Sequence, residues 1–464
     1  MLNENSRTYR FPLYVILLTV LMLFSISNIP EDAEVFGMSI KEFNLFSDFP
    51  DAETESNRIV NPDNAENPVI LKAGIMPEVD LNKNYITYQN INGLVRQVKI
   101  EGNTEQLKYF LDALKNSGSS GVRIAHIGDS IIEGDYITAE FRRILQQKFG
   151  GKGVGFMSVT SMDTKFRLTS NHKFSDDWQT YSLFGKKSKK YVYSLNGEVF
   201  IPAEGSSVSY ELRKDYKSSS EFSVAKILFS GSGKSKVTIT INDKNKEDIN
   251  LTEASGITEA VKNLDKSAVK AEFKFKPSES LTVTGISLES NSGIIIDNYP
   301  YRGNTGAALS ELSENSLKEL NKLQNYKLIV LQFGLNAVAM KKSDYSDFKK
   351  KFSEGIKLLK KSFPETSIIM MGISDKSAKK GSAFVTDPVI KDLIDMQKEI
   401  SKETNIAFWN TFEAMGGQNS MVKWVKNKPA YAHSDFTHFN KTGADKIGEM
   451  FAKTLIEKYA EYTK

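Results

Sequence analysis

The 464-residue chain contains no cysteine. Disulfide bonds, thiolate metal sites, a thiol nucleophile and a lipidated N-terminal cysteine are therefore excluded. An excess of charge of one sign is also lacking, because 61 Lys and Arg residues against 57 Asp and Glu residues give a net charge of +4. Binding to nucleic acid needs a concentrated basic patch, and this small surplus on a long chain does not indicate one.

Histidine is scarce, with only four residues in the chain: His126, His172, His433 and His438. Any histidine-dependent chemistry must use one of them. Their spacing does not resemble that of a metal site, and we expect neither a metal nor another cofactor. His126 lies in an apolar run and is expected to be a hydrogen-bonded core residue, whereas His172 is expected to be exposed.

The N-terminal part of the chain has its own pattern. Residues 11–29 carry no charge, and this length is close to the roughly 20 apolar residues that span a bilayer. Arg7 and Arg10 precede the segment, which favours a cytoplasmic N-terminal end. This pattern predicts that residues 1–30 form a transmembrane anchor or a cleaved signal segment. Either one places the rest of the chain in the cell envelope, on the extracytoplasmic (periplasmic) side. The polar residues 31–100 predict a linker or stalk.

Apolar runs alternate with amphipathic segments in two parts of the chain, residues 101–165 and 291–464. Strands that alternate with helices predict an α/β fold built on a doubly wound parallel sheet. The runs predict buried strands at residues 122–128, 327–333, 367–373 and 406–409. The amphipathic spacing predicts helices at residues 104–117, 136–149, 344–363, 389–404 and 443–462.

Residues 166–290 have a different pattern, in which apolar and polar residues alternate. The alternation is clearest at residues 208–213, 236–242, 271–276 and 281–290. Short alternating segments between turn-forming residues are typical of antiparallel strands. The sequence therefore predicts a β-sandwich domain inserted into the α/β domain after its first strand and helix.

A candidate nucleophile, Ser130, follows the first predicted strand in the sequence Gly128-Asp129-Ser130. Ligands of open α/β sheets bind at the carboxyl ends of the strands. A serine there, directly before a helix, has an exposed hydroxyl and a backbone N–H that points toward a developing oxyanion. The same residue types are common in ordinary turns, so the triplet needs support from elsewhere in the chain.

Asp435 and His438 supply that support, three residues apart and directly before the last predicted helix. A serine hydroxyl needs a base, and an imidazole needs a carboxylate on its other nitrogen to fix its tautomer. Asp435 can provide this carboxylate to His438 within one loop. His433 precedes the same carboxylate and is the alternative base.

Two further loops contain candidate donors for an oxyanion. Asn336 follows the strand predicted at residues 327–333 and carries a side-chain amide. Gly303 and Gly306 follow another apolar run, and a glycine lets its backbone N–H approach a ligand without a Cβ in the way. Gly303 is preferred for its spacing from Asp297, and Gly306 is the alternative.

The sequence resembles the SGNH (GDSL-type) hydrolase superfamily in the order of these motifs along the chain: Ser130, the glycine loop, Asn336 and the Asp435–His438 pair. The resemblance covers residues 103–165 and 293–464. It implies a flavodoxin-like sheet and a carboxylic ester hydrolase (an acylhydrolase). By the same resemblance Ser130 is the nucleophile, His438 the base and Asp435 its partner.

The resemblance also implies an oxyanion hole formed by Ser130, Gly303 and Asn336. The sequence departs from the family pattern at one position, because Ala337 follows Asn336 where the family usually has aspartate. The inserted β-domain and residues 150–156 resemble the exported peptidoglycan or polysaccharide O-acetylesterase branch, whose inserts resemble carbohydrate-binding modules.

Five residues are candidates for substrate binding: Asp129, Gly306, Gly417, Trp424 and His433. Residues 414–421 together with Trp424 resemble a segment of exported SGNH proteins. The glycines and the tryptophan there would form a sugar-stacking loop, or the tryptophan packs that loop against the core.

The predicted function is an exported serine esterase that removes O-acetyl groups from a cell-envelope glycan. One alternative is an O-acetyltransferase that uses the same triad, with an acyl-transfer partner in the membrane that the sequence does not identify. The other is a catalytically inactive, membrane-tethered glycan-binding protein. We expect an acetylated glycan as the ligand and membrane attachment through residues 11–29.

Overall fold

The computed structural model describes residues 34–35, 38–39, 94–231, 233–278 and 280–464. The first unit of the chain, Met1–Val79, is described only at an antiparallel pair of short strands, β1 (Glu34–Val35) and β2 (Met38–Ser39). The predicted membrane span and most of the predicted stalk lie outside the described residues. None of the helices in the described ranges is both long enough and apolar enough to cross a membrane.

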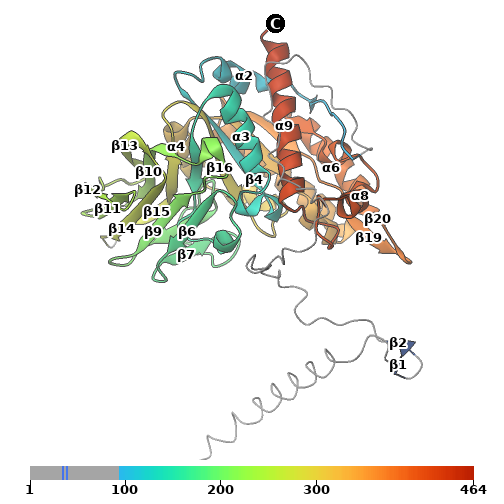
Figure 1. The fold of residues 1–464 in the computed structure, drawn as a ribbon, viewed down its shortest axis with the longest axis horizontal. Helices are drawn as coiled ribbons and strands as arrows, with labels where there is room; N and C mark the ends of the chain where they lie inside the picture. The colour runs from blue at the N-terminus through green and yellow to red at the C-terminus, as the bar shows by residue number, and fades with distance from the viewer. Residues whose placement is uncertain (1–33, 36–37, 40–93, 232, 279) are drawn as a thin grey trace, which may run out of the picture. The chain divides into compact units, whose positions relative to one another are not determined.

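A six-stranded sheet forms the centre of the second unit, Asp80–Lys464 (Figure 1). Neighbouring strands are parallel, except that the last one pairs antiparallel with the strand beside it. The predicted parallel sheet is thus confirmed. In sheet order the strands are β16 (Gly293–Pro300), β4 (Gly121–Gly128), β17 (Tyr326–Gln332), β18 (Ser367–Met371), β21 (Ala407–Trp409) and β3 (Glu101–Gly102).

Helices cover this sheet. In Figure 1, α3 (Thr138–Phe149) and α9 (Lys441–Tyr462) lie side by side in front of it, and their side chains pack together. A second row consists of α5 (Tyr345–Ser362), which packs against both α4 (Glu314–Gln324) and α6 (Val389–Glu403). The short helix α2 (Lys108–Lys115) packs against strands β4, β17 and β18.

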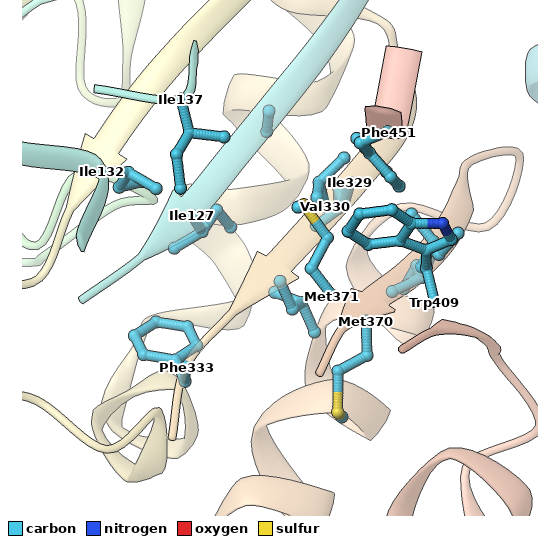
Figure 2. Close-up of a cluster of buried hydrophobic side chains, with 14 of the residues drawn as sticks. Ile127, Ile132, Ile137, Ile329, Val330, Phe333, Met370, Met371, Trp409 and Phe451 are labelled. Atoms are coloured by element: carbon cyan, nitrogen blue, oxygen red, sulfur yellow. The ribbon is translucent and has the colours of Figure 1, made fainter. Parts of the chain in front are cut away.

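The apolar strand residues form a continuous core with the helices (Figure 2). Burying an aliphatic or aromatic side chain of this kind stabilises the fold by roughly 1.5–3 kcal/mol. Strands alone do not complete the core, because Phe451 of α9 packs against the Trp409 ring of β21, with ring centroids 5.3 Å apart. The fully buried members in Figure 2 include Ile127, Ile329, Val330, Met370, Met371, Trp409 and Phe451.

Two antiparallel sheets lie between the two parts of the α/β sequence. One contains β13 (Thr258–Ala268), β10 (Phe222–Ser230), β15 (Thr282–Glu289), β8 (Glu198–Ile201) and β7 (Gln179–Ser182), with β5 (Gly153–Met157) also paired to β15. The other contains β12 (Asn245–Asn250), β11 (Lys236–Ile241), β14 (Lys270–Lys276), β9 (Ser207–Leu212) and β6 (Ser170–Phe174).

These two sheets share one buried cluster of side chains. It contains Phe229 and Ile286 from the first sheet and Ile239 and Phe273 from the second. The period-two pattern of the sequence arises here, because alternate residues of β9, β11 and β14 are buried in this cluster. Strand β5 precedes the boundary predicted at residue 165, yet it already belongs to an antiparallel sheet.

A buried ionic cluster joins the antiparallel strands to the parallel sheet. The Arg123 guanidinium on β4 donates to both carboxylate oxygens of Asp297 on β16, at 2.8 and 2.9 Å, and to Glu289 on β15. All three side chains are at most 4% exposed. Burial disfavours the charge of Arg123, but the two carboxylates hold its pKa well above the usual value. The two kinds of sheet are therefore linked by charges that stabilise one another.

Replacing Arg123 with leucine should lower the free energy of unfolding by about 3–5 kcal/mol, because the buried Asp297 carboxylate would lose its cation and Glu289 would keep only Lys226, at 3.1 Å. Arg123→Leu can be compared with the wild type by urea denaturation. The matched control is Arg213→Leu, which removes an exposed ion pair with Asp215 and should change stability by less than about 1 kcal/mol. Equal losses in the two variants would contradict the role assigned to the buried cluster.

Candidate active site

The carboxyl ends of three neighbouring strands, β16, β4 and β17, meet at one edge of the parallel sheet. Backbone hydrogen bonds tie the loops together there. Asp129 N–H donates to the Gln332 carbonyl at 3.1 Å, and Tyr301 N–H donates to the Gly128 carbonyl at 2.6 Å. A Cβ on Gly128 would lie only 2.7 Å from the Gln332 oxygen, so the close approach of the two loops requires glycine. The three loops expected to carry Ser130, Gly303 and Asn336 are therefore adjacent.

Ser130 begins a short 3-10 helix, η2 (Ser130–Asp135), and is partly exposed. Asp129 caps this helix, because its carboxylate accepts the Ile131 N–H at 3.0 Å. Burial raises the pKa of Asp129 to about 6, although backbone N–H groups of Ile131, Gly334 and Leu335 favour its charged form. The Asp129 side chain is 1% exposed. Its prediction as a substrate-binding residue is wrong, since this carboxylate binds backbone and holds two loops together.

Asp435 and His438 form the expected pair, in the loop between α8 (Ser420–Lys426) and α9. One Asp435 oxygen lies 2.7 Å from His438 Nδ1, and the other accepts the N–H groups of Thr437 and His438 at 2.9 and 3.0 Å. Because a carboxylate only accepts hydrogen bonds, Nδ1 carries the proton and Nε2 keeps a lone pair.

The electrostatics of this pair favour a charged Asp435 and a more basic His438. Partial burial opposes the charge of Asp435, but the hydrogen bonds from His438 and the loop backbone lower its pKa well below the usual range. The same hydrogen bond from His438 to Asp435 raises the pKa of His438 above its ordinary value of 6.5. Such an imidazole can accept a proton from a hydroxyl in the pocket described below.

The structure distinguishes the two glycines proposed as oxyanion donors. Gly306 is buried, and its N–H already donates to the Asn304 side chain at 2.7 Å. A Cβ at Gly306 would lie 2.8 Å from the Phe352 ring, so this glycine serves packing, and neither a donor role nor substrate binding fits it. Gly303 is exposed, has a φ of +73° and has open space around its Cα.

Asn336 lies beside the same loop. Its side-chain Nδ2 donates to the Asn304 carbonyl at 3.0 Å, which leaves its second N–H for another acceptor. Ala337, at the position where the family pattern has aspartate, is fully buried in the core. A carboxylate without a partner would be costly there.

A pocket of about 190 Å³ lies at this edge of the sheet. It is smaller than the roughly 300–1,000 Å³ usual for drug-sized ligands. The candidate nucleophile and base both line it, together with His433, which was predicted as a substrate-binding residue. Its lining consists of Ser130, Ile131, Glu133, Tyr136, Phe166, His433, His438 and Phe439.

Trp424 and Gly417 do not belong to this pocket. Trp424 is fully buried, and its indole N–H lies 2.9 Å from the Leu94 carbonyl and 3.1 Å from that of Met415. Gly417 is also buried. Their prediction as substrate-binding residues is wrong, because a side chain without exposed surface cannot stack on a sugar. The alternative, a tryptophan that packs the loop against the core, is the one observed.

Two other histidines have structural roles. His126 is fully buried and hydrogen bonded to Thr138 and Gln332 at 2.9 and 3.0 Å, which confirms the expected core role. Burial lowers its pKa to about 4. His172 was expected to be exposed, but it is 6% exposed and stacks on Tyr210. It points into the cluster between the antiparallel sheets, which its sequence surroundings did not indicate.

Four further pocket residues were not predicted from the sequence: Glu133, Tyr136, Phe166 and Phe439. Glu133 and Tyr136 follow Ser130 within six positions, so proximity to the nucleophile was an available signal. Phe439 directly follows His438, so its proximity to the candidate base was also an available signal. Phe166 had no such signal, because it reaches the pocket only through the packing of a distant loop.

The fold of the chain has a counterpart among solved structures. A peptidoglycan O-acetylesterase matches with 21% sequence identity, covering 78% of this chain and 99% of that chain, with a TM-score of 0.62. Comparisons with protein-family models and with curated protein sequences find no match. At this identity the match shows a shared fold. The chain therefore shares the fold of this peptidoglycan O-acetylesterase, in agreement with the fold that the motif resemblance predicts.

Other carbohydrate esterases match less extensively. A family two carbohydrate esterase from Cellvibrio japonicus has 8% identity, covers 64% of this chain and 100% of its own, and has a TM-score of 0.25. An acetyl xylan esterase has 16% identity, covers 35% of this chain and 81% of its own, and has a TM-score of 0.26. These scores are too low to support an argument about function.

Proposed function

We propose that the protein is a serine esterase that removes O-acetyl groups from a cell-envelope glycan. The observation that carries this proposal is the Asp435–His438 pair, hydrogen bonded at 2.7 Å, in the same pocket as Ser130. Nucleophile, base and orienting carboxylate are the three parts of a serine hydrolase. An inactive glycan-binding protein would have no need for this charged, partly exposed pair.

The proposed reaction uses these groups in two steps. Ser130 Oγ attacks the ester carbonyl while His438 Nε2 accepts the hydroxyl proton. The oxyanion accepts hydrogen bonds from the N–H groups of Ser130 and Gly303 and from the Asn336 amide. The sugar hydroxyl leaves with the proton from His438. Water, activated by the same imidazole, then attacks the acetyl-enzyme and releases acetate and free Ser130.

The size and openness of the pocket support this substrate and this reaction. About 190 Å³ suits a short acyl group such as acetyl better than a long chain. The His438 side chain is 47% exposed, which gives water access to the acetyl-enzyme and favours hydrolysis over acetyl transfer. The likeness to a peptidoglycan O-acetylesterase supports a glycan as the acetylated partner.

The proposal includes export and a role for the inserted sheets. The uncharged residues 11–29 support attachment to the membrane or export, with the pocket outside the cytoplasm. Recovery of the full chain as a soluble cytoplasmic protein after cell fractionation would contradict this part. We propose that the two antiparallel sheets between residues 153 and 289, which share one buried cluster, form a β-sandwich module and that this module binds carbohydrate.

The test of the function is acetate release. The full chain, incubated with O-acetylated peptidoglycan, should release acetate, and Ser130→Ala should not. An added sugar acceptor should not become acetylated. Acetylation of the acceptor in preference to acetate release would identify an acetyltransferase, and no reaction in either assay would favour a binding protein.

Asn336→Ala should lower kcat by about 10²–10³-fold, the usual loss for one oxyanion donor. Its thermal stability should change little, because only one hydrogen bond, to the Asn304 carbonyl, is lost. The control is Asn321→Ala, which removes a similar bond to the Ser362 carbonyl away from the pocket and should keep full activity. Equal kcat values for the two variants would refute the oxyanion role.

A further inference from the structure

The three tryptophans of the chain cannot form a platform for a sugar ring. Trp178 is 9% exposed, and Trp409 and Trp424 are fully buried. Among the described Phe, Tyr and Trp residues, the exposed ones are Phe166, Phe384 and Tyr462. Of these three, Phe166 lines the pocket. It is 42% exposed, so part of its ring is open to solvent at the pocket.

The Phe166 ring is held in place by a neighbouring glycine. Gly134 has a φ of +67°, and a Cβ there would lie 2.7 Å from the Phe166 ring, so the ring rests directly on the backbone. The buried Asp163 carboxylate accepts the Gly134 N–H at 3.1 Å and binds Arg167 at 2.8 Å. Leu168 N–H donates to the Gly134 carbonyl at 2.9 Å. Gly134 lies only four residues after Ser130, at a kink fixed by these hydrogen bonds, so the ring has a fixed place relative to the nucleophile.

A second aromatic residue, Tyr136, lines the same pocket and is also held by its neighbours. Asp135 and Ile137, on either side of it, have φ values of +68° and +61°. For a β-branched residue this conformation costs on the order of 1–3 kcal/mol and persists only where the surroundings impose it. The buried Asp135–Arg142 ion pair, at 2.7 Å, anchors the segment.

Polar groups lie beside these rings. Glu133 lines the pocket and binds Arg302 at 3.0 Å, and the Arg302 side chain is 56% exposed. A pyranose presents an apolar C–H face, which packs on an aromatic ring, and hydroxyls at its edge, which need charged or polar partners. Aromatic rings beside a carboxylate and a guanidinium therefore match the two kinds of surface on a sugar.

We propose that Phe166, together with Tyr136, binds the pyranose ring that carries the acetyl ester, with Glu133 and Arg302 on its hydroxyls. This inference rests on the proposed function and names the part of the pocket that recognises the glycan. The recognition then involves the segment between β5 and β6, which carries Phe166, and the segment after Ser130, which carries Glu133 and Tyr136. The acetyl group, in contrast, lies at Ser130.

Binding is measured first, without hydrolysis. Full-length Ser130→Ala protein is titrated with an O-acetylated peptidoglycan fragment by calorimetry. In the Ser130→Ala, Phe166→Ala double variant, Kd should be about tenfold higher than in Ser130→Ala, since one aromatic stacking contact is lost. Adding Phe166→Trp should leave Kd within about threefold, because the larger ring retains the face. The control is Tyr462→Ala, an equally exposed ring at the end of α9, which should not change Kd.

Activity gives the second readout. In protein that keeps Ser130, Phe166→Ala should raise KM for the acetylated glycan about tenfold relative to the wild type. The same variant should keep kcat/KM for ethyl acetate within about twofold of the wild-type value. An unchanged Kd in the binding assay, or equal losses on glycan and ethyl acetate, would overturn the inference. If wild-type protein binds the fragment but hydrolyses no acetyl ester, the proposed function fails while the binding comparison still decides the role of Phe166.

Discussion

Replacing His438 with alanine should lower kcat for ester hydrolysis as far as replacing Ser130 does, by roughly 10⁵–10⁶-fold. Ser130 is a poor nucleophile unless its proton is removed, and the His438 imidazole, oriented by Asp435, lines the same pocket. The two groups act in one step, so their losses should not add. The Ser130→Ala, His438→Ala double variant should be scarcely slower than either single variant in an acetate-release assay.

His433→Ala is the matched control for this prediction. His433 also lines the pocket, and its backbone N–H donates to the His438 carbonyl at 2.9 Å, a bond that the substitution keeps. We expect a loss of less than about tenfold, expressed mainly in KM. If His438→Ala retained activity that disappeared only when His433 was also replaced, His433 would be the base and the proposed triad would be incorrect.

Asp435→Asn should lower kcat by about 10⁴-fold with the loop still folded. An asparagine amide can donate to His438 Nδ1, which favours the tautomer that carries its proton on Nε2 and cannot accept another. The variant should also change the pH profile. Catalysis needs neutral His438, so wild-type kcat/KM rises with pH through the pKa of His438, which Asp435 raises.

Without the carboxylate this pKa falls, and the acidic limb of the Asp435→Asn profile should move to lower pH. The control is Asp392→Asn on α6. It removes the exposed ion pair between Asp392 and Lys342 and should leave both kcat and the pH profile unchanged. A profile for Asp435→Asn that keeps its wild-type midpoint would show that the hydrogen bond seen between Asp435 and His438 does not set the basicity of the imidazole.

Much of the α/β framework could be predicted from the sequence because the signals are local. The all-apolar runs predicted at 122–128 and 327–333 correspond to β4 (Gly121–Gly128) and β17 (Tyr326–Gln332). The helix predicted at 443–462 is α9 (Lys441–Tyr462). An apolar strand or an amphipathic helix has its periodicity written in consecutive residues, so no tertiary contact is needed to recognise it. The same holds for Asp435 and His438, three residues apart in one loop.

The remaining features depended on which distant residues became neighbours. Gly303 and Gly306 lie in one loop, and the fold distinguishes them by packing the Phe352 ring close to Gly306 and leaving Gly303 exposed. From the sequence, Trp424 could face either a sugar or the core. In the fold it is fully buried, and its indole N–H donates to the carbonyl of Leu94, a residue far away in the sequence.

The sequence by itself thus determined the order of the strands and helices and the chemistry available at the strand ends. The tertiary structure alone decided which of those groups are exposed. It brought Phe166, 36 positions after Ser130, into the pocket by packing its ring on Gly134. Burial is a property of the whole fold, because the atoms that cover a side chain come from segments far away in the sequence.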